Sequence, residues 1–86
     1  MNQALKINEQ DTVAVALIEL KSGKDVFGVS TTDTIPVAHK VALTPIAEGD
    51  TVIKYGNVIG IATCDIAPGE HVHTHNMRTS LDEDLK

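Results

Sequence analysis

The chain repeats IAEGDTVIKYG, at residues 46–56, as IAPGEHVHTHN, at residues 66–76, with only partial changes. Each segment begins with an apolar residue, reaches a glycine at its fourth position, and continues through an acidic residue into a strand-like stretch. Glycine is typical of tight turns because it adopts positive φ angles without a steric penalty. The repeat therefore predicts two related turn-and-strand units that pack together. Two units are too few for a solenoid.

Histidines distinguish the second unit. His71, His73 and His75 alternate along it, and residues two apart in a strand point to the same face. The three rings would share one face if the strand runs as far as His75. Imidazole serves both as a general acid or base and as a transition-metal ligand, and a His-x-His pair can reach one ion from one side. Two histidines do not complete a metal site, and the alternative is an exposed edge strand hydrogen-bonded through Thr74 and Asn76.

The composition describes one small domain with an aliphatic core. The chain has 86 residues, a formal net charge of −5, and Phe27 and Tyr55 as its aromatic residues. Val and Ile favour β-structure, and so thin a core is suited to support from a partner surface or another subunit. A basic stripe with interleaved aromatic residues is absent from the sequence, which argues against nucleic-acid binding. The sequence contains a single cysteine, Cys64, which excludes both a disulfide within this sequence and a Cys-rich zinc site.

Membrane and export signals are not apparent in the sequence. No apolar run approaches the length of a membrane span, and the first residues lack the apolar core of a signal peptide. We therefore expect a soluble, cytoplasmic protein that does not bind membranes.

Short strands separated by turn signals predict an all-β fold with no amphipathic helix. The expected strands before the histidine strand span residues 12–20, 26–29, 37–43, 51–55 and 58–63, the first two forming a hairpin. Gly60 inside a strand indicates a close backbone approach. We expect a single domain over residues 1–86, with a core at about 11–77 after a short lead-in and a polar C-terminal tail at 78–86.

Two short pairs of polar residues are further candidates for binding. His39-Lys40 and Lys54-Tyr55 lie on expected strands next to Pro or Gly turns. A lysine can bind a carboxylate, and Tyr or His can move protons. The alternative is that both lysines are ordinary solvated strand positions. The glycines do not form a phosphate-binding loop, and the sequence contains no evident nucleophile–base pair.

Four ordered blocks resemble a known family: IPVAHKVAL (35–43), VIKYG (52–56), IGIAT (59–63) and VHTHN (72–76). They are similar to the N-terminal SAF domain of the altronate/galactarate dehydratase family, over about Asp11 to Leu81. The resemblance implies a small β-clip fold. The family often has Gly where this chain has Ala38, a departure in the turn before His39.

The resemblance also implies a function. Family members remove water from sugar acids such as altronate or galactarate, typically with Fe2+, and a related two-subunit lyase removes sulfite from sulfolactate with this domain as its small subunit. On this basis catalysis and metal binding are assigned to His73 and His75. Substrate binding is assigned, from the same matched blocks, to His39, Lys40, Lys54, Tyr55 and Asn76. Gly56 also matches the pattern, whereas His71 lies outside it and ranks below the other two histidines.

The larger C-terminal portion of the family is missing from this sequence. We therefore expect a small subunit or N-terminal domain of a lyase that acts with a larger catalytic chain or domain on a small hydroxy acid. Two alternatives remain at this point: a non-catalytic module that binds a sugar acid or docks a subunit, and a purely structural or assembly domain. An exposed strand edge is also suited to pairing with another copy of the chain. Loss of water and loss of sulfite are not distinguished by these residues.

Overall fold

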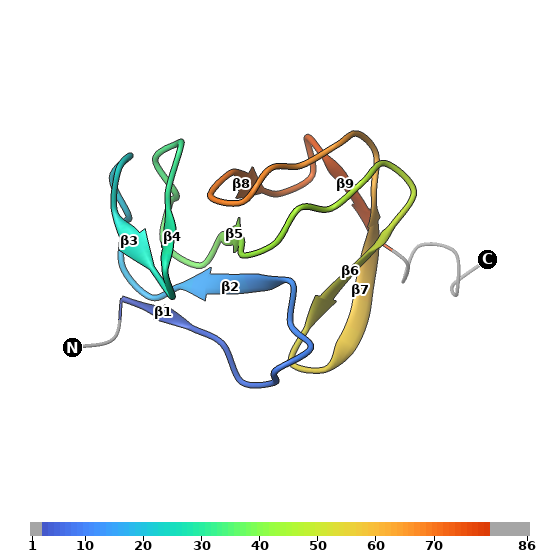
Figure 1. The fold of residues 1–86 in the computed structure, drawn as a ribbon, viewed down its shortest axis with the longest axis horizontal. Coiled ribbons are helices and arrows are strands. Elements are labelled where there is room, and N and C mark those ends of the chain that lie inside the picture. Colours follow the sequence, from blue (N-terminus) through green and yellow to red (C-terminus); the bar gives the residue numbers. More distant parts are fainter. Residues whose placement is uncertain (1–2, 80–86) are drawn as a thin grey trace.

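The computed structural model describes residues 3–79 and forms an all-β fold, which confirms the expected fold class. Figure 1 shows its short strands in sequence order. They are β1 (Ala4–Leu5), β2 (Val13–Ala16), β3 (Asp25–Val26), β4 (Val29–Ser30), β5 (Lys40–Ala42), β6 (Thr51–Lys54), β7 (Asn57–Ala62), β8 (His71–Val72) and β9 (Met77–Thr79). The described residues include no helix that is long and apolar enough to cross a membrane.

A four-stranded antiparallel sheet, in the order β1-β2-β5-β8, forms the centre of the molecule. The β3–β4 hairpin lies on one side of it and the β6-β7-β9 sheet on the other, at the left and right of Figure 1. Consecutive residues of the central strands point to opposite faces of the sheet. Val13 and Ala42 pack against β6-β7-β9. Ala14 and Val41 pack against the β3–β4 hairpin. The central sheet is therefore covered on both faces.

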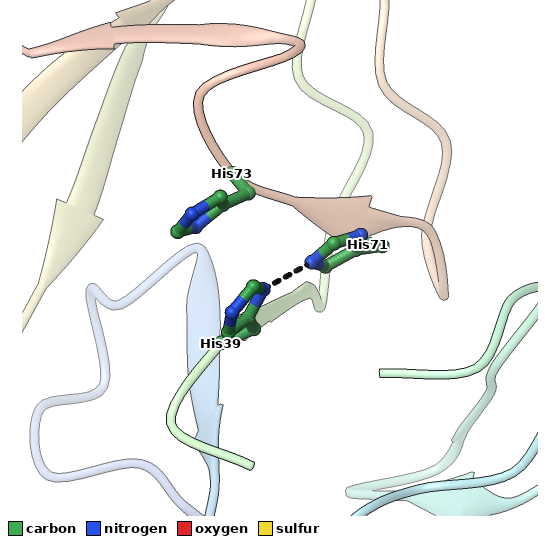
Figure 2. Close-up of side chains that lie close together, drawn as sticks. All are labelled: His39, His71 and His73. Carbon is green, nitrogen blue, oxygen red and sulfur yellow. Dashed lines mark hydrogen bonds between the residues drawn. The ribbon is translucent and has the colours of Figure 1, made fainter. Parts of the chain in front are cut away.

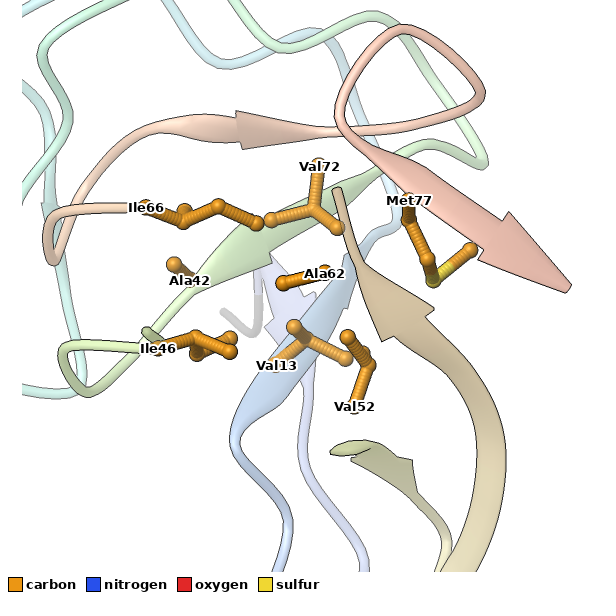
Figure 3. Packing of buried hydrophobic residues seen from close by; sticks show 8 residues of the cluster. All are labelled: Val13, Ala42, Ile46, Val52, Ala62, Ile66, Val72 and Met77. Atoms are coloured by element: carbon orange, nitrogen blue, oxygen red, sulfur yellow. The ribbon is translucent and has the colours of Figure 1, made fainter. Parts of the chain in front are cut away.

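Two small aliphatic clusters hold these layers together. Figure 3 shows the cluster between the central sheet and β6-β7-β9, formed by Val13, Ala42, Ile46, Val52, Ala62, Ile66, Val72 and Met77. The second cluster lies beneath the hairpin and contains Ala4, Ala14, Ala16, Leu20, Val26, Ile35 and Val41. Val72 is fully buried, so packing of this one side chain fixes the short strand β8 against β5.

One turn motif occurs four times within residues 3–79, twice as often as the sequence repeat indicates. Segments 20–26, 35–41, 46–52 and 66–72 each run from a bridged Leu or Ile, through a turn, into a strand whose second residue is a buried Val. The copies associate in pairs, because Leu20 bridges Ile35 and Ile46 bridges Ile66. The predicted packing of segments 46–56 and 66–76 is confirmed by the second pair.

The fourth position of each turn has a positive φ angle. It is glycine at Gly23, Gly49 and Gly69, with φ of 87°, 89° and 90°, but Ala38 takes this place in the second copy with φ of 71°. A side chain in this left-handed region is destabilised by about 1–2 kcal/mol per residue. Ala38, which immediately precedes His39, is thus a strained residue in an otherwise glycine position.

Replacing Ala38 with glycine is expected to stabilise the domain by up to about 1 kcal/mol, the relief of strain being partly offset by the greater entropy of glycine in the unfolded chain. Urea unfolding of Ala38→Gly measures the change. Ala47→Gly, in an exposed turn position that is outside the positive-φ region, is the matched control and should be destabilising. Equal losses in both variants would contradict the strain at Ala38.

The expected hairpin between residues 12–20 and 26–29 is wrong. β2 pairs with β1 and β5, and residues 26–29 are not one strand but the turn of the β3–β4 hairpin, with Val26 aligned to Val29. Phe27 and Gly28 both have positive φ, at 50° and 83°. Such two-residue hairpin turns usually carry Asn-Gly or Asp-Gly, so Phe27 concealed the turn.

The strands at 51–55 and 58–63 are confirmed as β6 and β7, joined by the Tyr55-Gly56 turn. The close approach at Gly60 is also confirmed: a Cβ atom there would lie 2.5 Å from the Arg78 carbonyl oxygen. The fold extends beyond the range 11–77, because β1 pairs with β2 and β9 pairs with β7. Residues 80–86 of the expected tail lie outside the described residues.

Asp11 is a buried carboxylate that ties the lead-in segment to the β6–β7 turn. It accepts hydrogen bonds from the main-chain N–H of Gly56 (2.7 Å), Asn8 (3.2 Å) and Ile7 (3.3 Å). Burial alone would raise the pKa of this carboxyl, but the main-chain hydrogen bonds outweigh it and hold the pKa below the ordinary 3.8. The folded state therefore favours the ionised form of the Asp11 carboxyl.

Acid is expected to weaken the fold through Asp11. Because its folded pKa is depressed, its stabilising contribution is complete above the unfolded pKa near 3.8 and is lost as pH falls through the lower folded value. Urea unfolding of wild type and Asp11→Asn at pH 6 and pH 3 measures this effect. The difference between the two proteins should shrink at pH 3. Asp25→Asn serves as the control for loss of an exposed carboxylate.

Candidate functional site

Three histidines from two segments converge at the edge of the central sheet (Figure 2). His39 follows the turn that leads into β5, His71 begins β8, and His73 lies in the bend just after it. His39 Nδ1 lies 2.7 Å from His71 Nε2, within hydrogen-bonding distance. One ring nitrogen from each histidine falls within 4.8 Å of the others.

The rings of this three-histidine cluster (His39, His71 and His73) are stacked. The centroids of His39 and His73 are 4.0 Å apart and their planes differ by 18°. The ring centroids of His71 and His39 are 4.9 Å apart. His75 is exposed and tilted at the margin, with its ring 5.0 Å from that of His71. All four histidines of the chain thus gather in one place.

Strand pairing explains why His39 and His71 meet. Val41 aligns with His71 between β5 and β8, and His39 lies two residues before Val41 on the same face. The strand itself ends at Val72, so the predicted single strand through His75 is not formed. His73 reaches the cluster through a bend instead.

The Asn76 side chain stabilises that bend through hydrogen bonds to the main chain. Its side chain is buried; the Oδ1 atom accepts a hydrogen bond from the His73 N–H at 3.0 Å, and Nδ2 donates to the His71 carbonyl oxygen at 2.8 Å. Both ends of the amide therefore hold the main chain between two members of the cluster. This contact makes Asn76 a positioning residue, while its predicted contact with substrate stays a prediction.

The environment favours neutral imidazoles. Desolvation, followed by the nearby charges of His75, His39 and His73, lowers the pKa of His71 from its ordinary value of 6.5 despite an opposing effect of Asp33. Desolvation and the charges of His39, Lys40 and His75 likewise lower the pKa of His73. Neutral imidazole is the form that binds metal ions.

His73 also has an unsatisfied ring atom. Its Nδ1 is buried and has no hydrogen-bond partner among residues 3–79. A buried polar atom without a partner is destabilising by about 1–3 kcal/mol and calls for an explanation. A bound ligand that accepts the lone pair of Nδ1, such as a metal ion, would provide the missing partner.

Lys40, Lys54 and Tyr55 are not members of the three-histidine cluster. Lys40 aligns with Val72 and so points to the opposite face of β5 from His39. Desolvation, and to a smaller extent the charge of Lys54, lower the pKa of Lys40 from its ordinary value of 10.5. Lys54 Nζ lies 4.9 Å from the centre of the Tyr55 ring. Neither lysine has a carboxylate in ion-pair range among residues 3–79.

A shallow groove of about 420 Å3 lies elsewhere, between the paired turns at 46–50 and 66–70. It is lined by Pro45, Ile46, Ala47, Asp65, Ile66, Ala67, Pro68 and Glu70. None of the histidines lines it. The candidate site is therefore the half-buried histidine cluster rather than this groove.

Comparisons with known proteins agree with the sequence resemblance. Residues 2–80 match the altronate/galactarate dehydratase SAF domain. The chain is 49% identical to altronate dehydratase from Escherichia coli (strain K12) over 94% of its own length, and 42% identical to that from Bacillus subtilis (strain 168) over 96%. Over 52% of its length it is 56% identical to (2R)-sulfolactate sulfo-lyase subunit alpha from Paracoccus pantotrophus.

The chain spans only part of these relatives. It covers 17% and 18% of the two dehydratases and 67% of the sulfo-lyase subunit. In the dehydratases the matching segment is thus a small part of a larger protein, and in the sulfo-lyase it lies within one named subunit. Because the match to the family covers nearly the whole chain, the chain belongs to the altronate/galactarate dehydratase SAF domain family.

Proposed function

We propose that the chain is the small subunit or N-terminal domain of a lyase that eliminates water or sulfite from a hydroxylated carboxylic acid. The observation that carries this proposal is the three-histidine cluster, found in a domain whose relatives are named altronate dehydratase and sulfolactate sulfo-lyase. An elimination of this kind needs a base for the proton next to the carboxylate and an acid or metal ion to help the leaving group depart.

The cluster fits a divalent metal ion, which we propose is Fe2+. Metal–nitrogen bonds of about 2.1 Å place neighbouring ligand nitrogens about 3 Å apart, close to the 2.7 Å between His39 and His71. The unpartnered His73 Nδ1 and the lowered pKa values of His71 and His73 suit the same role. Imidazole ligands with open positions are typical of iron as well as zinc and other transition metals. When bound, the ion would act as a Lewis acid on a substrate oxygen.

This assignment changes the predicted roles of the histidines. His39 and His71 join His73 as ligands, although the resemblance implies substrate binding for His39 and ranks His71 lower. His75 stays in the proposal as the proton-transfer group, because it is exposed and adjacent to His71 rather than enclosed in the cluster.

The substrate carboxylate is proposed to bind at Lys40 and Lys54. Lys40 aligns with Val72, the residue before His73, and neither lysine is paired with a carboxylate in the described residues. The charge of Lys54 contributes to the lowered pKa of Lys40. An anionic substrate would relieve the repulsion between them. Tyr55, in contact with Lys54, presents a phenol for a hydrogen bond to the same acid.

A larger partner chain or domain would close the site. The three histidines are only half-buried, whereas elimination chemistry benefits from a site that excludes water. The sizes of the relatives support such a partner. A cytoplasmic location stays a prediction.

Co-expression with the protein encoded beside this chain, followed by purification through a tag on this chain, tests the proposal. We expect a larger protein to co-purify with iron and the complex to dehydrate sugar acids or release sulfite from sulfolactate. If the complex forms but is inert toward both classes of acid, the lyase proposal fails. Binding of a sugar acid by the isolated chain without metal or partner would support a non-catalytic binding module instead.

A further inference from the structure

The loop between β1 and β2 lies against the β6–β7 turn, next to Lys54 and Tyr55. Figure 1 shows the loop and the turn side by side at the lower edge of the view. The loop is held in shape by its own hydrogen bonds: Asn8 Oδ1 accepts from the Gln10 N–H at 2.9 Å, and the Asn8 carbonyl oxygen accepts from the Asp11 N–H at 3.0 Å. It therefore has a defined shape of its own and is more than a connection between two strands.

Asp11 and Thr12 make the hydrogen bonds from this loop to the hairpin. Asp11 Oδ1 accepts from the Gly56 N–H at 2.7 Å, within the turn. Thr12 Oγ1 accepts from the Ile53 N–H at 3.0 Å, and the Thr12 N–H donates to the Ile53 carbonyl oxygen at 2.9 Å. These contacts hold the main chain on both sides of the two intervening residues.

Tyr55 is held in a conformation that residues with a side chain rarely adopt. Its φ angle is 55°, in the left-handed region that glycine, asparagine and aspartate tolerate best. Residues in such conformations persist where the surrounding structure determines them, and they are frequent at ligand sites. In this conformation the centre of the Tyr55 ring lies 4.9 Å from Lys54 Nζ. The arrangement of the two side chains therefore depends on the contacts that hold the turn.

We propose that Asp11 and Thr12 are positioning residues for the substrate site, which hold the β6–β7 turn so that it presents the Lys54 ammonium and the Tyr55 phenol to the substrate carboxylate. This inference rests on the proposed function, in which Lys54 and Tyr55 bind that carboxylate. Asp11 is buried, and both of its carboxylate oxygens accept main-chain hydrogen bonds. It therefore acts on the substrate through the turn and not by direct contact.

Steady-state kinetics of the co-expressed complex, with the sugar acid or sulfolactate that it converts, provide the first test. Asp11→Asn replaces one acceptor oxygen by an amide group that cannot accept a hydrogen bond. We expect KM to rise by about 10–100-fold with kcat within about threefold of wild type, because misplaced groups that bind substrate and transition state equally change KM alone. Fe2+ affinity should not change, since the three-histidine cluster is intact.

Two further substitutions and a control make this test specific. Thr12→Val removes the hydroxyl that accepts from the Ile53 N–H and should also raise KM. Thr12→Ser keeps the hydroxyl and should restore the wild-type KM. Asp25→Asn, which removes an exposed carboxylate elsewhere, is the matched control and should leave KM unchanged.

Proton NMR of the metal-free chain reads the turn without partner or substrate. The Tyr55 ring should shift the Hε signals of Lys54 upfield, and Tyr55→Leu defines their unshifted position. We expect D11N and T12V to move these signals toward that position, whereas D25N should not. A merely structural role of Asp11 would lower the stability in urea and leave both KM and the Lys54 signals as in wild type.

The proposal is overturned if the folded variants D11N and T12V keep either the wild-type KM or the wild-type Lys54 signals. If D11N does not fold, comparison of T12V with T12S decides the question. Failure of the proposed function looks different, because the wild-type complex then converts none of these acids. In that case the Lys54 signals still decide whether Asp11 and Thr12 hold the turn.

Discussion

The variant His73→Ala is expected to lose stoichiometric Fe2+ binding, with a dissociation constant raised by more than about 100-fold. A ligand substitution should exceed the 10–100-fold effect of losing an outer hydrogen-bond partner. The metal-free fold should survive, because the variant removes a desolvated ring whose Nδ1 has no partner in the described part of the chain. Isothermal titration under argon measures the metal affinity, and thermal unfolding without metal measures the stability.

His75→Ala provides the matched control. It removes the exposed histidine at the margin of the cluster, at a ring distance of 5.0 Å from His71. We expect H75A to keep Fe2+ within about threefold of wild type but to slow turnover of the assembled enzyme by about 100-fold, a typical loss for a proton-transfer group. Loss of metal in H75A with retention in H73A would reverse our assignment of the two residues.

Gly69→Ala should destabilise the domain more than any other single glycine substitution in the turn motif. Gly69 has φ of 90°, and a Cβ atom there would collide with the carbonyl oxygen of Ser30. Left-handed strain contributes about 1–2 kcal/mol and forced overpacking about 1–3 kcal/mol, so we expect a total loss of about 2–5 kcal/mol. A small domain has about 5–15 kcal/mol in all, so G69A should be largely unfolded at elevated temperature.

Gly49→Ala separates the two causes. Gly49 has nearly the same φ, 89°, but nothing lies within 4 Å of its Cβ position. Its loss should therefore be limited to about 1–2 kcal/mol, a fall of a few to several degrees in the melting temperature. Circular dichroism melts of both variants measure the difference. Equal melting temperatures would show that the Ser30 contact adapts without penalty.

Local signals in the sequence predicted the parts of the fold that depend on neighbouring residues. The β6–β7 hairpin follows from the strand-like runs at 51–55 and 58–63 on either side of Gly56, although Tyr55 belongs to the turn rather than to the first strand. The β3–β4 hairpin was missed because Phe27 occupies a position where Asn or Asp is usual. Only two copies of the turn motif were recognised. Ala38 replaces the glycine in the copy at 35–41, whereas the copy at 20–26 keeps Gly23 but differs from the repeat at most of its other positions.

The candidate site was harder to predict because it depends on contacts between distant segments. Alternation along one strand grouped His71, His73 and His75, but the strand ends at Val72 and the Asn76 side chain bends the chain there. His39 joins the cluster because of the pairing register between β5 and β8, and no pattern in the neighbouring sequence predicts that register. The turn motif was the available signal: His39 and His71 occupy adjacent positions, fifth and sixth, in two of its copies.

X-ray absorption spectroscopy of the chain loaded with one equivalent of Fe2+ tests the central claim most directly. The three-histidine cluster predicts a first shell that includes three imidazole nitrogens at about 2.1 Å, falling to two in His39→Ala and in His71→Ala. A first shell of oxygen atoms alone, unchanged in these variants, would contradict the assignment of the cluster as the metal site.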